Sequence, residues 1–376
     1  MAASARIVAH CVIVEKVITT ATGLRALLPA DNVVRGSGMG NDRGVRPTMK
    51  DVAAEAGVAL KTVSRVVNNE PGVNAATADR VRAAIERLGY SRNESARVLR
   101  QGRTSSIGLV IEDVGDPFYS GVSRAVEDVA IRHGSLVLSG SSAEEPARER
   151  ELVLTFCARR VDGLIVVPAG ADHSYLRSEL AAGTPAVFVD RPAGPGLDVD
   201  TVLCDNRGGA RMATAHLLAH GHRRIAFLGD SPTIYTAGER EHGYREALGD
   251  LVDERLISMA HPELDRVRAD LDRMLGMDDP PTALFTGNGR LTMTVLRALA
   301  GRRMALIGFD DFELADLLSP GVSVVSQDSA GLGRVSAELL FRRIAGGGGP
   351  AERVQLPVRL IPRGSGELPP EAPRSS

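Results

Sequence analysis

Residues 48–90 read TMKDVAAEAGVALKTVSRVVNNEPGVNAATADRVRAAIERLGY, and this stretch decides the fold of the amino-terminal part of the chain. Thr48 can cap a first helix, and Gly57 supplies the tight turn that ends it. A second helix is expected over residues 59–68, and Asn74 can cap a third. Two short helices that are joined by a glycine turn and followed by a third predict a helix-turn-helix domain.

The second helix has the two faces that DNA recognition needs. On a helical wheel Val63, Val66 and Val67 cluster on one side, while Lys61 and Arg65 fall on the opposite side. An arginine or lysine on an exposed helix face can reach guanine O6 and N7 in the major groove. A bundle with solvated charges is the alternative for this helix taken alone, but the complete three-helix pattern favours DNA binding.

The composition is that of a globular protein. The chain has 376 residues, and this length indicates about two or three domains. Its net charge is −2. Near-neutrality hides a basic segment, because residues 47–106 carry ten Lys or Arg against six Asp or Glu. Three widely spaced cysteines exclude a disulfide framework and fit a reducing cytoplasm. No apolar run reaches about 18 residues, so we expect no transmembrane helix and no membrane partner.

From residue 106 onward, strand-like apolar runs alternate with helical stretches. This alternation predicts mainly parallel sheets with helices on both faces, and the number of strands predicts two lobes. The fold class is therefore an all-α helix-turn-helix head followed by a two-lobed α/β domain. The expected boundaries are an extension at 1–46, the head at 47–91, a hinge helix and linker at 92–105, an α/β domain at 106–361 (lobe 1 about 106–204 and 327–355, lobe 2 about 205–326 and 356–361) and a flexible tail at 362–376.

The first 46 residues have no persistent helical or strand pattern and end in the turn-rich run GSGMGNDRGVRP. Two interpretations stay open for them. They form either a disordered extension or an over-extended reading frame whose true start is Met39.

Two runs in the head carry a resemblance to a known family. D-V-A-x-x-A-G-V stands at residues 51–58, and T-V-S-R-V-V-N stands at residues 62–68. Both resemble hallmarks of the lactose-repressor/galactose-repressor (LacI/GalR) family of transcriptional regulators. The resemblance continues to about residue 365 through DPFYSGV, VDGLIVVP, FVDRP, HLLAHGHRRIAFLGD, EREHGYREAL, LIGFDD and LIPRGS. It implies a periplasmic-binding-protein-like effector domain, a homodimer on a pseudo-palindromic double-stranded DNA operator, and a repressor controlled by a small sugar or sugar-like effector.

The resemblance also assigns roles to residues of the head. Leu60, Lys61 and Arg65 match the base-reading positions, and residues 93–99 match a hinge helix that inserts a leucine wedge into the minor groove. The family usually has a proline where Arg92 stands, so the rigid entry to the hinge is lost here. The full set of expected DNA-binding residues is Thr48, Leu60, Lys61, Thr62, Ser64, Arg65, Asn68, Tyr90, Asn93, Ala96, Arg97 and Leu99.

Polar residues follow the ends of the predicted strands, where ligands bind in doubly wound sheets. A polyhydroxyl ligand needs such carboxylates, amides and guanidinium groups, although strand ends are often polar for no functional reason. The resemblance adds further pocket positions, whereas Gly289 stands where the family commonly has a sugar-binding aspartate. The expected effector-binding residues are Asp116, Phe118, Arg191, Arg211, Arg240, Asn288, Asp310 and Gln327.

Other motifs carry no positive signal for chemistry. His216, His220 and His222 have a metal-like spacing, but the resemblance accounts for this run without a metal. Gly331-x-Gly333 lacks the lysine of a phosphate loop and is interpreted as a turn. We expect buried structural thiols, no cofactor, no metal and no enzymatic activity. The alternatives are a solute-binding uptake protein, or a sugar-modifying enzyme with a regulatory head.

Overall fold

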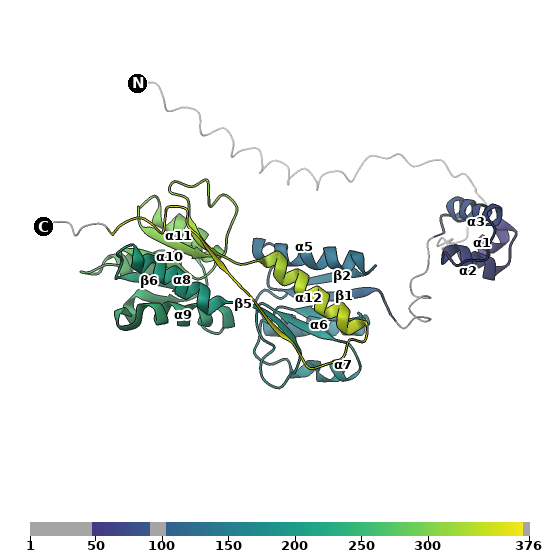
Figure 1. The fold of residues 1–376 in the computed structure, drawn as a ribbon, viewed down its shortest axis with the longest axis horizontal. Coiled ribbons are helices and arrows are strands. Elements are labelled where there is room, and N and C mark those ends of the chain that lie inside the picture. Colours follow the sequence, from purple (N-terminus) through teal and green to yellow (C-terminus); the bar gives the residue numbers. More distant parts are fainter. Residues whose placement is uncertain (1–46, 91–102, 371–376) are drawn as a thin grey trace, which may run out of the picture. The chain divides into compact units, whose positions relative to one another are not determined.

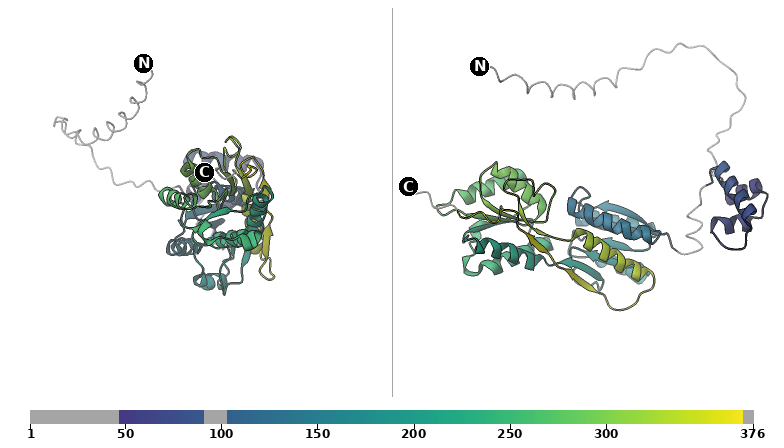
Figure 2. Two further views of the ribbon diagram at one scale, coloured as in Figure 1. Left: turned by 90° about the vertical axis from the view of Figure 1, so that its left-hand side faces the viewer. Right: turned by 45° about the horizontal axis from the view of Figure 1, so that its top comes forward.

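The chain divides into two compact units, residues 1–92 and 93–376. The computed structural model describes residues 47–90 of the first unit and residues 103–370 of the second. Figure 1 labels their elements, and Figure 2 shows the same units from two further directions.

The described part of the first unit is a bundle of α1 (Met49–Ala56), α2 (Leu60–Val67) and α3 (Ala75–Leu88). Thr48 begins α1 with a capping box, because its amide and its hydroxyl donate to Asp51 Oδ2 at 2.7 and 2.8 Å. Gly57 ends α1 at φ 63°, a conformation that favours glycine. The apolar faces of the helices meet in a core that includes Val52 and Val63, both 0% exposed.

The second unit contains two sheets, each of six strands in the described residues. The sheet of lobe 1 has the order β11-β5-β4-β3-β1-β2, and that of lobe 2 has the order β12-β10-β9-β8-β6-β7. Within the described residues, neighbouring strands of both sheets pair in parallel except β10 with β12, which is antiparallel. The strands are β1 (Ser106–Ile111), β2 (Leu136–Ser141), β3 (Leu164–Val166), β4 (Ala186–Val189), β5 (Asp200–Cys204), β6 (Ile225–Gly229), β7 (Ile257–Met259), β8 (Ala283–Thr286), β9 (Ala305–Phe309), β10 (Ser323–Ser326), β11 (Arg353–Leu356) and β12 (Arg359–Ile361).

Helices cover both faces of each sheet, as expected for buried parallel strands. In lobe 1 the pair α5 and α12 packs on one face and α6 on the other, and in lobe 2 the pairs α8–α9 and α10–α11 cover opposite faces (Figure 1). The helices are α5 (Pro117–Arg132), α6 (Pro146–Ala158), α7 (Arg177–Ala181), α8 (Asn206–Ala219), α9 (Tyr235–Leu248), α10 (Leu264–Leu275), α11 (Gly289–Leu299) and α12 (Ser329–Ile344).

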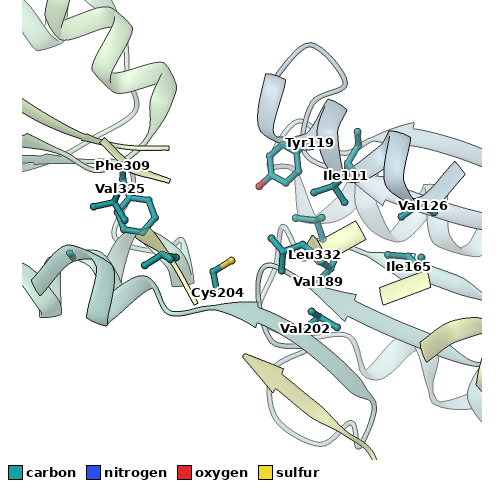
Figure 3. Packing of buried hydrophobic residues seen from close by; sticks show 14 of the residues in the cluster. Ile111, Tyr119, Val126, Ile165, Val189, Val202, Cys204, Phe309, Val325 and Leu332 are labelled. Atoms are coloured by element: carbon teal, nitrogen blue, oxygen red, sulfur yellow. The ribbon is translucent and has the colours of Figure 1, made fainter. Parts of the chain in front are cut away.

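The chain passes between the lobes after β5, after β10 and between β11 and β12. Buried residues on both sides of these crossings belong to one hydrophobic cluster. Figure 3 shows Cys204 between Phe309 of lobe 2 and Val189 of lobe 1. The crossings therefore pack in one hydrophobic cluster that both lobes share. A ligand bound between the lobes can contact both of them.

Helix α12 corrects the interpretation of Gly331-x-Gly333 as a turn, because both glycines lie inside this helix. A Cβ on Gly333 would lie 2.3 Å from the carbonyl oxygen of Val122 in α5. The glycine therefore serves a close helix–helix approach rather than a turn.

The flexible tail predicted from residue 362 is wrong for residues 362–370, which pack against lobe 2. Ser365 is 4% exposed and donates its amide to Gly321 O at 3.0 Å. His222 Nε2 lies 2.8 Å from Leu368 O. These backbone contacts join the segment to lobe 2 although its composition is rich in Pro, Gly and Glu. Residues 371–376 lie outside the described part of the chain.

Candidate functional site

Helix α2 presents the residues that the sequence assigned to base recognition. Val63 is fully buried, whereas Leu60 is 44% exposed and Lys61 is also exposed. An exposed leucine at the start of such a helix can contact a thymine methyl group. Ala59, the residue before α2, offers no side chain to cap the helix, so the first amides of α2 have no side-chain acceptor there.

Arg65 is half-buried and lies along the loop between α2 and α3. A Cβ on Gly72, whose φ is +101°, would be 3.6 Å from Arg65 Nη1. Arg65 lines a shallow groove together with Thr62, Gly72 and Thr77. The structure therefore brings Lys61, Thr62 and Arg65 together on one surface.

The other DNA-binding predictions have mixed placements. Asn68 donates to Ser64 Oγ at 3.4 Å on the exposed end of α2. Thr48 is exposed at the start of α1 and caps it. Tyr90 is 9% exposed and belongs to the core of the head, which makes it a packing residue. The predictions for Asn93, Ala96, Arg97 and Leu99 lie outside the described residues.

A cleft opens where the carboxyl ends of strands from both lobes face each other. Such a convergence follows from the parallel order of the two sheets. Most of the predicted effector residues line it: Asp116, Phe118, Arg191, Arg240, Asn288, Asp310 and Gln327. The other residues of the lining that carry the argument below are Glu112, Tyr119, Asp190, Asp230, Gly287 and Arg290.

On the lobe 1 wall, Arg191 is the centre of a buried network. The guanidinium is 5% exposed and donates to both carboxylate oxygens of Glu144, at 2.6 and 2.8 Å. It also donates to Pro168 O at 2.9 Å and to the Tyr119 hydroxyl at 3.3 Å. Burial would raise the pKa of Glu144, but the hydrogen bonds from Arg191 hold this pKa below its usual value.

On the lobe 2 side, Arg240 forms part of the cleft floor. It is 5% exposed, and its Nε donates to Asn206 Oδ1 at 2.8 Å. Nη1 donates to Gly287 O at 2.6 Å and lies 3.7 Å from Asp310 Oδ2. The guanidinium stacks over the ring of Phe309, 3.9 Å from its centroid.

Asp190 and Asp310 occupy equivalent places in the two lobes. Each follows a central strand, and each has a positive φ, 69° and 72°. Aspartate adopts this region at a cost that tertiary structure must offset, and such strain clusters at ligand sites. Burial raises the pKa of Asp190, and the nearby charge of Asp310 adds to the rise while Arg191 opposes it.

Arg290 at the start of α11 was missed by sequence reasoning. Its Nη1 lies 3.0 Å from Glu112 Oε1 and its Nη2 3.5 Å from Asp113 Oδ2, so it bridges lobe 2 to lobe 1. Burial and a hydrogen bond with Glu144 raise the pKa of Glu112. The strand end at Gly287 could have indicated this position, but nothing in the sequence pairs it with residues almost 180 positions earlier.

The prediction that Arg211 binds the effector is wrong for this arrangement, because Arg211 is exposed and absent from the cleft lining. The inward face of α8 includes Ala210, Ala213, Thr214 and Leu217. Arg211 lies about 100° around the helix from Ala210, which turns it toward solvent.

The histidines and thiols have structural partners. His216 Nε2 lies 2.5 Å from Glu367 Oε1, and His222 Nδ1 lies 2.9 Å from Thr282 Oγ1. Cys204 is buried, Cys157 is half-buried, and burial raises both thiol pKa values. Among the described residues no cluster of three metal-ligating side chains is found, and no helix is long and apolar enough to span a bilayer.

Comparison with known proteins matches both units to described families. Residues 48–93 match the bacterial regulatory proteins of the lacI family, and residues 214–366 match the periplasmic binding protein-like domain. The chain is 34% identical over 340 residues to the HTH-type transcriptional regulator CelR of Thermobifida fusca, covering 86% of this chain and all of that protein.

Two solved structures have the same architecture. A CelR–cellobiose complex is similar with a TM-score of 0.63 and 32% identity, covering 85% of this chain and 100% of that one. The Lac repressor dimer bound to operator and the anti-inducer ONPF gives a TM-score of 0.74 at 26% identity, covering 86% and 99%. The helix-turn-helix head, the two-lobed domain and these matches show that the chain belongs to the lacI family of DNA-binding transcriptional regulators.

Proposed function

We propose that α2 lies in the major groove of an operator, where Leu60, Lys61 and Arg65 meet the base edges. The observation that supports this is that Leu60 is exposed at the start of α2, while Lys61 and Arg65 line one groove and Val63 is fully buried. The polar side chains of Thr48, Thr62, Ser64 and Asn68 contact the DNA around these base-reading groups. Phosphate contacts then fix the register of the helix, and base contacts specify the sequence.

We also propose that the chain acts as a homodimer on a pseudo-palindromic operator. Two copies of one helix-turn-helix head match two half-sites related by the same two-fold symmetry. The related Lac repressor was solved as a dimer bound to operator, which supports this assembly. The hinge that the resemblance assigns to residues 93–99 lies outside the described part of the chain and stays a prediction. This proposal also implies that the protein acts in the cytoplasm, where operator DNA lies.

The cleft between the lobes is proposed to bind a small sugar or sugar derivative that controls repression. Carboxylates, amides and guanidinium groups from both lobes line it, which is the chemistry that polyhydroxyl ligands need. The related CelR was solved with cellobiose, which supports this class of ligand. A ligand that contacts both lobes favours one lobe arrangement and shifts the population toward it. No catalytic role is assigned to the cleft residues.

Footprinting on the DNA upstream of the protein's own gene tests the regulator proposal. We expect a protected site of two-fold symmetry with wild type and loss of protection with Arg65→Ala. Arg82→Ala is the matched control, because Arg82 is an arginine of α3 whose side chain is 64% exposed outside the proposed surface. Equal protection by wild type and Arg65→Ala would contradict the assignment of Arg65, and absence of protection by wild type would contradict regulation of this promoter.

A thermal-shift screen of sugars tests the effector part. A ligand that binds the folded state alone raises the unfolding temperature. We expect one sugar to do so and to change operator binding in the same concentration range. A sugar that stabilises the protein without changing operator binding would contradict its role as effector.

A further inference from the structure

The cleft is richer in carboxyl groups than in cations. Among the described residues of its lining, five carboxyl groups stand against three guanidinium groups. The carboxyl groups are those of Glu112, Asp116, Asp190, Asp230 and Asp310. Their field disfavours a ligand that brings a further negative charge.

The three guanidinium groups are already engaged by acceptors of the protein. Arg191 donates to Glu144 and to a main-chain carbonyl, and Arg240 donates to Gly287 O. Arg290 is paired with two carboxylates across the lobes. The positive charge of Arg191 and Arg290 is therefore already balanced by protein carboxylates, which weakens its attraction for a phosphate or carboxylate on a ligand.

The buried polar side-chain atoms without a hydrogen-bond partner among the described residues include two cleft acceptors, Asp190 Oδ1 and Gln327 Oε1, and one cleft donor, Arg191 Nε, which lies 3.5 Å from Asp190 Oδ2. Asp190 is 3% exposed, and its other oxygen accepts from the Tyr119 hydroxyl at 3.3 Å. A buried acceptor without a donor is costly, so these atoms need hydroxyl or ammonium hydrogens.

The pKa values of two cleft carboxyl groups also indicate that this site disfavours negative charge. Burial raises the pKa of Asp116 and of Asp190, and in both cases the charge of Asp310 contributes to the rise. Both shifts show that this site disfavours negative charge, and an anionic group on the ligand would meet the same cost of burial beside Asp310.

We propose that the effector is a sugar without an anionic group, either neutral or amino-bearing, and that the cleft rejects sugar phosphates and sugar acids. This inference rests on the proposed sugar-binding function and narrows its ligand class. Hydroxyl or ammonium groups of the ligand donate to Asp190 Oδ1 and Gln327 Oε1, and the arginines keep their protein partners.

The experiment is calorimetric titration of the full chain with matched sugars that share one carbon skeleton. Each set contains the neutral sugar, its 2-amino form, its 6-phosphate and its uronic acid, for glucose, galactose and cellobiose. We expect the neutral or amino form of one skeleton to bind at least about tenfold more tightly than its phosphate and its uronate. Tighter binding of a phosphate or uronate would overturn this inference and leave the sugar proposal standing. Absence of binding by every member would overturn the sugar proposal itself, and this inference with it.

Charge-removing variants give a second readout. Asp190→Asn and Asp116→Asn keep the side-chain shape, and each removes one carboxylate from the cleft. We expect the preference for the neutral over the phosphorylated sugar to fall in both variants. Arg211→Ala, outside the cleft, is the control and should keep the wild-type preference. A preference that stays unchanged in both cleft variants would overturn the electrostatic basis of the proposal.

Discussion

Arg240→Met is the change that tests the cleft floor most directly. The substitution keeps an unbranched apolar stem but removes a guanidinium that is 5% exposed. It leaves Gly287 O and Asn206 Oδ1 without their donor, and it removes the cation 3.7 Å from Asp310. Because Asn206 and Gly287 are buried, their acceptor oxygens lose a charged donor that water replaces only in part.

The expected cost follows from these contacts. Hydrogen bonds from a charged donor contribute about 1.5–3 kcal/mol each, and breaking a buried charged pair costs about 3–5 kcal/mol. We expect the second unit to lose about 3–5 kcal/mol of unfolding free energy. At about 2–4 °C per kcal/mol, its unfolding temperature should fall by about 6–20 °C.

The assay is calorimetric unfolding of the full chain, with Arg211→Met as the matched control. Arg211 is an exposed arginine on α8, so its replacement should change stability by less than about 0.5 kcal/mol. The head does not contain Arg240, so its own transition should stay in place. A loss below about 1 kcal/mol in Arg240→Met, or one equal to the control, would refute the reasoning.

Three further predictions concern the head, the bridge between the lobes and a buried ion pair. Arg65→Ala should lower the binding free-energy difference between the operator and a variant with one changed base pair by about 1–3 kcal/mol, measured by competition between the two DNAs. If the variant loses as much affinity for random DNA as for the operator, Arg65 contacts phosphate and not a base. Arg290→Gln removes the ion pair between Arg290 and Glu112 that joins the two lobes, and it should weaken effector binding by about two- to fivefold at low salt. The effect should be smaller at high salt, because this ion pair is partly exposed and salt screens it. An unchanged affinity at low salt would contradict a role of Arg290 in lobe closure. His173 Nε2 and Glu149 Oε1 form a buried ion pair 2.9 Å apart. Although burial opposes both shifts, this close approach raises the pKa of His173 and lowers that of Glu149. The stabilisation from protonated His173 is fully present below its ordinary pKa of 6.5, and it is lost as pH rises through the higher pKa of the folded state. The free energy of unfolding in urea should therefore differ between wild type and His173→Gln most at pH 6, and this difference should shrink toward alkaline pH. A difference that stays constant with pH would contradict the pairing.

The helix-turn-helix head could be predicted because its signals are local. A capping pair at Thr48, the turn at Gly57 and the valine stripe of α2 lie within a few residues of one another. Tyr90 was assigned to DNA from its place in a motif, but it packs in the core. Only the packing of α1 and α3 around it shows which way its ring turns.

The cleft was predicted in outline because strand ends converge wherever sheets are parallel. That rule brought Asp116, Asp310 and Asn288 to one place. The same rule does not predict which residues of the two lobes contact each other. Arg290 pairs with Glu112, which lies 178 positions earlier in the sequence. It also cannot place Arg211, whose exposure depends on which face of α8 packs inward.

The sequence by itself determined the elements of this protein and the surface of α2 that we propose to face DNA. These follow from periodicity, caps and turns, which act over a few residues. Only the tertiary structure decided that Gly333 serves helix packing, that residues 362–370 belong to lobe 2, and that the cleft carboxyl groups outnumber its guanidinium groups. Those properties depend on which distant segments are brought together, and local patterns do not encode such distances.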